Sequence, residues 1–166
     1  MFRLDGRQQS EAAICHTGQK AMNPECPTTP ERSRIMAAIP SRDTKPEVAL
    51  RRACWRMGLR YRKHRRDLPS TPDFAFARAR VAVFVDGDFW HGRAFFGEGK
   101  CPARNREYWA AKFARNRGRD LAADEALRAM GWLPLRVWAS DISARLPACA
   151  RLVRVAVRLR ERRGDA

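Results

Sequence analysis

The run of five apolar residues from Val81 to Val85 constrains the fold of this chain more than any other feature. A strand that is apolar on both faces must be covered on both, which requires helices on either side of a sheet. The segment that follows it, Asp86-Gly87-Asp88-Phe89-Trp90-His91, combines two carboxylates, two large aromatic side chains and an imidazole. Packing alone does not require that combination, so this strand end is a candidate functional site.

Periodicity and turn residues predict the remaining elements. Thr44, Pro46 and Glu47 have the pattern of a capping box that opens a helix, and Gly58 ends that helix. The other predicted elements are a short helix at 31–39, strands at 59–62, 74–76, 81–85 and 133–138, a loop at 92–103, and helices at 105–130 and 147–163. This order predicts an α/β fold in which helices flank a mixed central sheet.

The chain is strongly basic, with 34 Lys and Arg residues against 18 Asp and Glu residues and a formal net charge of +16. Residues 1–30 contribute three charges of each sign, so the excess belongs to residues 31–166. Such a domain is expected to have a polyanionic partner, most simply nucleic acid; a solubilising or ribosome-binding surface is the alternative.

The last predicted helix separates apolar from basic residues. One side carries Leu152, Val155, Ala156 and Leu159, and another carries a row of arginines, Arg151, Arg154, Arg158 and Arg162. The arginine row either contacts nucleic acid or only keeps the protein solvated.

The five cysteines are scattered and form no C-x-x-C pair, which disfavours a zinc ribbon and a disulfide framework. No apolar run is long enough to span a membrane, and the N-terminus lacks the apolar core of a secretory signal. We therefore expect a cytoplasmic protein, and a monomer. Residues 1–30 are predicted to be a disordered leader, or translation from a start upstream of the natural one, for which Met22 is a candidate.

An aspartate also opens the strand before the apolar run, because Asp73 follows Pro72. If the strands at 74–76 and 81–85 pair as a hairpin, Asp73 lies beside Asp86, and a cation with oxygen ligands fits between these strand ends. Mg²⁺ keeps most of its water, so one carboxylate and one main-chain carbonyl suffice, and a bound water can act as a nucleophile. Taken singly, each of these residues also has a plain structural role in a turn or a core.

The motifs together resemble the very-short-patch-repair (Vsr) mismatch endonucleases, a branch of the PD-(D/E)xK nuclease superfamily. The resemblance spans residues 31–142, about two thirds of the chain. In order, the matching motifs are Ser41-Arg42-Asp43-Thr44 with Glu47, Pro72-Asp73-Phe74, Val83-Phe84-Val85-Asp86-Gly87, Phe89-Trp90-His91-Gly92, Asn105-Arg106-Glu107-Tyr108-Trp109 with Lys112, Asn116, Arg119 and Asp120, and Gly131-Trp132 with Arg136-Val137-Trp138.

The resemblance implies a restriction-endonuclease-like core and a role for each matched site residue. Asp73 would be the main Mg²⁺ carboxylate and the Val85 carbonyl a second ligand. His91 would be the general base or would align the attacking water, and Glu47 would hold waters of the metal shell. The endonuclease domain would cover 31–142, between the leader at 1–30 and a basic C-terminal helical extension at 143–166.

The resemblance also implies how the partner, double-stranded DNA, is bound. Phe89, Trp90 and Trp109 look like the aromatic wedge that the family inserts beside a T:G mispair, where opening a base step costs less. The alternative for Trp109 is simple packing of a helix on the sheet. Further DNA contacts are expected from Lys112, Asn116 and Arg119 and from basic residues at 60–66.

Two departures from the family matter. The positions that match its structural zinc ligands are Asp88, Arg93, Phe95 and about Ser140, none of them a thiol or an imidazole. We therefore expect no structural zinc, with the Phe95-Phe96 pair packing the loop instead.

The second departure is Asp86, which stands where the family often has a histidine partnered by the residue that matches Asp120. Two carboxylates there repel each other unless a metal or an arginine intervenes. Either Asp86 joins the metal site as a further catalytic residue, or the catalytic arrangement differs from that of the family.

The sequence therefore predicts a Mg²⁺-dependent DNA endonuclease that nicks one strand at or near a T:G mismatch. Two alternatives stay open. One is a related restriction or phage-defence nuclease without mismatch specificity, and the other is a catalytically silent DNA-binding module.

Overall fold

The computed structural model describes residues 34, 42–103 and 105–164. The leader at 1–30 and the helix predicted at 31–39 lie outside these residues, apart from Arg34, which is helical. The described elements are α2 (Lys45–Arg56), β1 (Arg62–Lys63), β2 (Phe74–Phe76), β3 (Val81–Asp86), α3 (Arg93–Glu98), α4 (Arg106–Ala129), β4 (Leu133–Trp138) and α5 (Ala139–Gly164).

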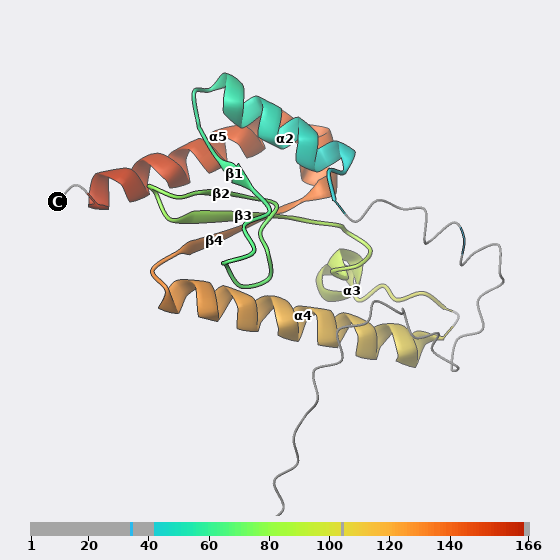
Figure 1. Ribbon diagram of the computed structural model, residues 1–166. Helices are drawn as coiled ribbons and strands as arrows, with labels where there is room; N and C mark the ends of the chain where they lie inside the picture. Colours follow the sequence, from blue (N-terminus) through green and yellow to red (C-terminus); the bar gives the residue numbers. More distant parts are fainter. Residues whose placement is uncertain (1–33, 35–41, 104, 165–166) are drawn as a thin grey trace, which may run out of the picture.

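A four-stranded sheet in the order β1-β2-β3-β4 forms the middle layer. The β1–β2 and β2–β3 pairs are antiparallel, and the β3–β4 pair is parallel. Figure 1 shows α2 and α5 over one face of the sheet and α4 across the other. The predicted α/β architecture, a mixed sheet flanked by helices, is therefore confirmed.

Strand β3 is central and buried on both faces. Val81 and Val83 pack into the core beneath α2 and α5, whereas Ala82 and Phe84 pack into a second core that includes Leu127 of α4. This alternation follows from the two-residue period of a strand. Helix α4 is the crossover that makes β4 parallel to β3, which pairs Asp86 with Trp138. The polar end of β3 is therefore paired with β4, whereas β2 pairs with β3 only up to Val83.

Two local predictions before and at β1 are wrong in part. Thr44 occupies the N-cap position of α2 as predicted, but its hydroxyl donates to the Glu47 carboxylate at 2.7 Å and makes no cap hydrogen bond to a helix amide. The strand predicted at 59–62 pairs only from Arg62, because Tyr61 instead packs its ring against Phe74 at 5.2 Å between ring centroids.

The loop predicted at 92–103 contains a helix, α3. Gly92 and Gly99 bound it with φ of 65° and 66°, a left-handed conformation that glycine adopts without steric cost. Phe95 packs on Phe96 and on Phe113 of α4, with centroids 5.0 and 5.4 Å apart. The glycines thus mark the ends of a short helix that is stabilised by tertiary aromatic contacts.

Helix α5 begins directly after β4 rather than at Pro147, with a non-helical residue at Arg145. Its buried residues are Ile142, Cys149, Ala150, Val153 and Val157, whereas Leu152, Val155 and Leu159 are each more than half exposed. The apolar side chains that the sequence pattern groups together are therefore largely exposed. Two apolar stripes coexist on this helix, and only packing against α2 selects between them.

The helix nevertheless belongs to the main core, because its buried residues contact the cluster that contains Leu50 of α2 and Val81 of β3. None of the helices in the described part of the chain is both long and apolar enough to cross a membrane.

Two valines of α5 test this packing. Val153 is fully buried and Val155 is 51% exposed. We expect Val153→Ala to lower the free energy of unfolding by about 2 kcal/mol, because it removes buried methyl groups and leaves a cavity. Val155→Ala, the matched control, should change it by less than about 0.5 kcal/mol. Urea denaturation measures both, and a larger loss for Val155→Ala would contradict the orientation of α5.

Candidate active site

The polar ends of β2 and β3 meet as the hairpin requires. Asp73 directly precedes β2, and its Oδ2 atom accepts a hydrogen bond of 2.7 Å from the Val85 main-chain nitrogen. The Asp73 carbonyl in turn accepts a hydrogen bond from the His64 main-chain nitrogen. The two predicted metal-binding residues, Asp73 and Val85, are therefore in direct contact.

Three carboxylates influence one another at this place. Burial is the main cause that raises the pKa of Asp73 to about 6; the Val85 hydrogen bond opposes it, and Glu47 and Asp86 raise it further. Arg51 lowers the pKa of Asp73 and is the smallest of these influences. Negative charge at Asp73 is thus incompletely compensated by the protein, which favours a bound cation.

Glu47 is the second candidate metal-shell residue, and it is 4% exposed. Its Oε1 atom accepts the Thr44 hydroxyl, while Oε2 is buried without a hydrogen-bond partner among the described residues. The described residues contain no group of three or more His, Cys, Asp or Glu side chains arranged around a metal position. A cation that takes few protein ligands and keeps its waters, such as Mg²⁺, fits Asp73 with the unpartnered Glu47 oxygen nearby.

His91 lies in the turn after β3, and α4 supplies its partner. The His91 Nδ1 atom is 2.7 Å from an Asp120 carboxylate oxygen and 3.8 Å from Asp86. When the neutral ring donates Nδ1–H to Asp120, the Nε2 lone pair remains available to accept a proton. The pair has the geometry of a general base that is oriented by a carboxylate.

Arg136 of β4 lies among the acidic side chains. Its guanidinium contacts Asp86 at 2.9 Å and Asp120 at 3.4 Å, and its Nε atom donates to both Asp124 oxygens at 3.1 and 3.2 Å. Burial is the main cause that raises the pKa of Asp86, and the charges of His91 and Arg136 oppose it. An arginine therefore separates the carboxylates of Asp86 and Asp120.

Sequence reasoning missed these roles of Arg136 and Asp124. The available signal was a charged residue in the middle of an apolar strand, since such a residue is rarely buried without acidic partners.

The predicted aromatic residues form one cluster next to His91. Phe89 contacts Trp90 and Trp109 with ring centroids 5.1 and 4.9 Å apart, and Trp109 packs on Phe113 at 5.7 Å. Phe89 is 47% exposed. The Lys112 amine lies 5.6 Å from the centre of the Trp90 ring, so a cation sits beside exposed aromatic surface. This combination is typical of surfaces that stack on nucleic-acid bases.

Asn116 and Arg119 stand further along α4 from the aromatic cluster. The Asn116 amide donates to the Trp90 carbonyl at 2.7 Å, and Arg119 donates to the Asn116 side-chain oxygen. In this arrangement Asn116 holds the turn that carries Trp90 and His91. Its role as a direct DNA contact stays a prediction.

Three of the four positions matched to zinc ligands, Asp88, Arg93 and Ser140, come together as a polar cluster. Arg93 donates to Asp88 at 3.2 Å, to the Ser140 hydroxyl at 2.6 Å and to Asp141 at 3.1 Å, and the Ser140 nitrogen donates to Asp88 at 3.0 Å. Hydrogen bonds from Arg93 and Arg145 lower the pKa of Asp141. The cluster joins the turn after β3, the start of α3 and the start of α5. The expected absence of a structural zinc stays a prediction.

The mixed sheet, with acidic side chains and a histidine at the end of its central strand, matches the predicted restriction-endonuclease-like core. Residues 26–96 match the model of a family described as DNA mismatch endonuclease Vsr. The chain is 45% identical over 131 residues to the Type II nicking enzyme V.NmeDIP of Neisseria meningitidis serogroup C, which covers 78% of this chain and 88% of the relative.

Two more relatives agree. The Type II nicking enzyme V.XorIIP of Xanthomonas oryzae pv. oryzae is 41% identical over 69% of this chain and 85% of the relative. The DNA mismatch endonuclease Vsr of Escherichia coli (strain K12) is 35% identical over 69% of this chain and 72% of the relative. The chain therefore belongs to the Vsr endonuclease family.

The raised pKa of Asp73 predicts a stability effect with a definite sign. The pKa of Asp73 is about 6 in the folded protein and 3.8 for an ordinary aspartate, so the stabilising contribution of the bound proton is complete below about pH 4 and is lost as the pH rises through 6. We expect Asp73→Asn, which keeps an oxygen for Val85, to raise the free energy of unfolding of the metal-free protein by about 2 kcal/mol near pH 7.5. Near pH 4 the gain should vanish.

Urea denaturation in a chelator at both pH values measures this difference. A variant that is no more stable than the parent near pH 7.5 would show that the Asp73 carboxylate is not destabilised by burial.

Chelation tests the Arg93 cluster. Because Arg93, Asp88, Ser140 and Asp141 satisfy one another, a metal is not needed to join the three segments. We expect EDTA to leave the thermal midpoint of the protein unchanged, and metal analysis of the purified protein to find no stoichiometric zinc. A fall of several degrees on chelation, restored by Zn²⁺, would contradict this expectation.

Proposed function

We propose that this DNA endonuclease uses Mg²⁺ to nick one strand of duplex DNA at or near a T:G mismatch. The observation that carries the proposal is the meeting of Asp73, Glu47 and the His91–Asp120 pair at the polar end of β3. A carboxylate site for a cation and an imidazole held by a second carboxylate are the two parts that hydrolysis of a phosphodiester by water requires.

One set of residues would bind the cation, and another would accept the proton of the attacking water. Asp73 and the Val85 carbonyl would hold the cation, and Glu47 would accept hydrogen bonds from its waters. When bound, Mg²⁺ supplies an acidified water and offsets the charge that grows on the phosphate. His91 takes a proton on Nε2, because Asp120 engages Nδ1 at 2.7 Å. Asp120 keeps the ring oriented and stabilises the imidazolium. The products are a 5′-phosphate and a 3′-hydroxyl.

Exposed aromatic surface beside this site supports recognition of a weakened base step. Phe89 is half exposed and is supported from behind by Trp109. Inserting an aromatic side chain replaces lost base stacking, and a mispaired step costs less to open than a matched one. Trp90 and Lys112 extend the same surface, so that base stacking and phosphate attraction act together.

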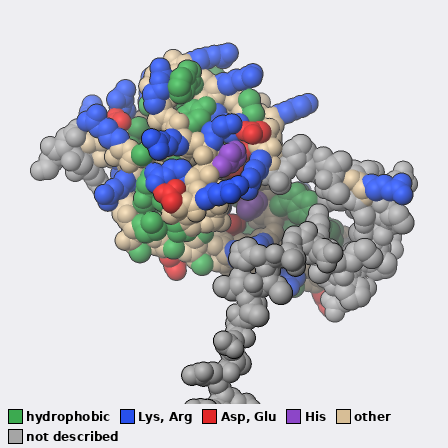
Figure 2. Space-filling model, in the orientation of Figure 1, with side chains coloured by type: hydrophobic (Ala, Val, Ile, Leu, Met, Phe, Trp, Pro, Cys, Tyr) green, Lys and Arg blue, Asp and Glu red, His purple; other side chains and the backbone are tan. Residues whose placement is uncertain are grey.

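The charge distribution supports duplex DNA as the partner. Figure 2 shows Lys and Arg side chains over the visible face, with only scattered acidic side chains among them. Lys112 and Arg119 of α4, with the basic residues at 60–66, are proposed to contact phosphates. We further propose that the enzyme acts as a monomer in the cytoplasm. Relatives named nicking enzymes and a relative named a DNA mismatch endonuclease support single-strand cleavage and mismatch recognition respectively.

A cleavage assay tests the proposal. End-labelled duplexes that differ only in one T:G or T:A pair are incubated with Mg²⁺ or with a chelator. We expect nicking of the mismatched duplex only, and only with Mg²⁺. Asp73→Asn should lower the rate at least about 10³-fold, because the cation contributes several kcal/mol to the transition state. Glu125→Gln, which removes an exposed carboxylate of α4, is the matched control.

Each other outcome has a definite meaning. Equal cleavage of both duplexes would show that the protein is a restriction-like nuclease without mismatch specificity. Binding of the mismatched duplex without cleavage would show that the protein is a catalytically silent DNA-binding module. Activity that survives in the chelator would refute the role of Mg²⁺.

A further inference from the structure

Three basic side chains converge on one carboxylate beside the candidate metal site. Asp43 lies just before α2, and its Oδ1 atom accepts a hydrogen bond from Arg51. The same oxygen is 3.8 Å from the Lys63 amine and 3.8 Å from His64 Nε2. These residues come from α2, β1 and the turn after β1, so the fold itself builds the cationic group.

Asp43 does not provide hydrogen-bond partners for all the nitrogens of these three basic side chains. Arg51 is 5% exposed, yet its Nη1 atom has no hydrogen-bond partner among the described residues, and neither does the buried Nε2 atom of His64. The Lys63 amine is too far from Asp43 for a hydrogen bond. Buried polar nitrogens are nearly always paired, so the two without a partner, on Arg51 and His64, with the half-exposed Lys63 amine beside them, indicate a place for a larger anion.

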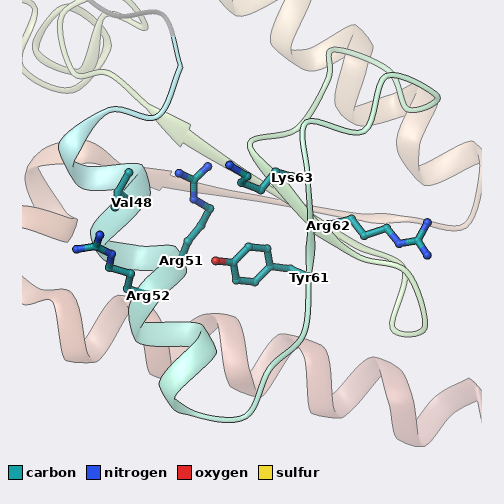
Figure 3. Close-up of a pocket in the computed structure, with 6 residues that line it drawn as sticks. All are labelled: Val48, Arg51, Arg52, Tyr61, Arg62 and Lys63. Carbon is teal, nitrogen blue, oxygen red and sulfur yellow. The ribbon is translucent and has the colours of Figure 1, made fainter.

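A cavity of about 580 Å³ opens beside Arg51 and Lys63, and it is lined by Val48, Arg51, Arg52, Tyr61, Arg62 and Lys63. In Figure 3 the head groups of Arg51 and Lys63 point to the same side of the cavity, and the Tyr61 hydroxyl faces α2. Arg62 extends away from them. Four of the six lining side chains are cationic, which excludes an apolar or cationic ligand.

The cavity adjoins the candidate active site. The His64 nitrogen donates to the Asp73 carbonyl at 3.3 Å, and the Arg51 charge acts on the Asp73 carboxylate. An anion bound by Arg51, Lys63 and His64 therefore lies next to the proposed cleavage position. Along a DNA strand, the groups at that position are backbone phosphates.

We propose that Arg51, Lys63 and His64 bind a backbone phosphate adjacent to the scissile one, and that Asp43 fills this phosphate position in the free protein. A phosphodiester shares one negative charge between two non-bridging oxygens, which match the forked guanidinium and the two further donors better than one carboxylate oxygen does. Asp43 is half exposed and has a left-handed φ of 53°. Its side chain can therefore turn into solvent when DNA arrives. This inference rests on the proposed DNA substrate.

Duplex binding measured without Mg²⁺, and therefore without cleavage, tests the proposal. Asp43→Asn should tighten binding of a T:G duplex about fivefold at low salt, because a competing negative charge is removed. Glu98→Gln is the matched control, since Glu98 also pairs with a basic side chain, Lys100, and is exposed. Arg51→Gln should weaken binding and lower the salt slope by about one.

A duplex series with single neutral methylphosphonates then locates the phosphate. One position should weaken binding by the parent protein and have no effect on Arg51→Gln. If Arg51→Gln does not fold, Lys63→Gln, on a half-exposed side chain, gives the same comparison.

The proposal is overturned if Asp43→Asn and Glu98→Gln behave alike, or if every methylphosphonate position affects parent and variant equally. A response of the His64 ring signals in NMR spectra to inorganic phosphate, without any effect of Arg51→Gln on DNA binding, would reassign the cavity to free phosphate. A parent protein that binds no duplex would refute the proposed function itself. A protein that binds duplex in this manner but does not cleave it would refute only the catalytic proposal.

Discussion

The contact of Arg136 with three carboxylates is the interaction on which the arrangement of this site depends. Asp86 ends the central strand, whereas Asp120 and Asp124 belong to α4, and a guanidinium from β4 contacts all of them. Without that positive charge, buried carboxylates on adjoining elements would repel one another and separate the helix from the sheet. The crossover from β3 through α4 to β4 thus brings together both the carboxylates that repel one another and the arginine that compensates their charge.

This compensation is local, and it divides the site into two parts. Asp86 and Asp120 share Arg136, and Asp120 in turn orients His91. Asp73 has no comparable partner: it accepts a hydrogen bond from a main-chain nitrogen and is buried near other acids. The side of the site whose carboxylate has no arginine paired with it is therefore the side suited to a cation. The side that has one is suited to holding an imidazole, and Asp86 connects the two.

The sequence predicted the fold where a pattern depends on local chain chemistry alone. The apolar run at Val81–Val85 could only be a covered strand, and its polar end had to lie beside Asp73 once the hairpin formed. Helix α3 and the buried face of α5 depend instead on contacts between distant segments, such as Phe95 on Phe113. No local period distinguishes Val153 from Val155, so the sequence could not choose the buried side.

The same reasoning explains why the roles of arginines were the hardest part of the site to predict. Arg136 sits in a strand, Arg93 begins a helix and Arg51 lies in the middle of one, and nothing in these local patterns marks them as different from the other arginines of so basic a chain. What separates them is contact with acidic side chains, which only the assembled fold creates. In a protein with a net charge of +16, the informative arginines are therefore those that the fold places against carboxylates. Arg136 and Arg93 donate their hydrogen bonds to carboxylates of the protein, whereas Arg51 keeps one buried nitrogen without a hydrogen-bond partner in the described part of the chain. That difference identifies the cavity beside Arg51 as a site for an external anion.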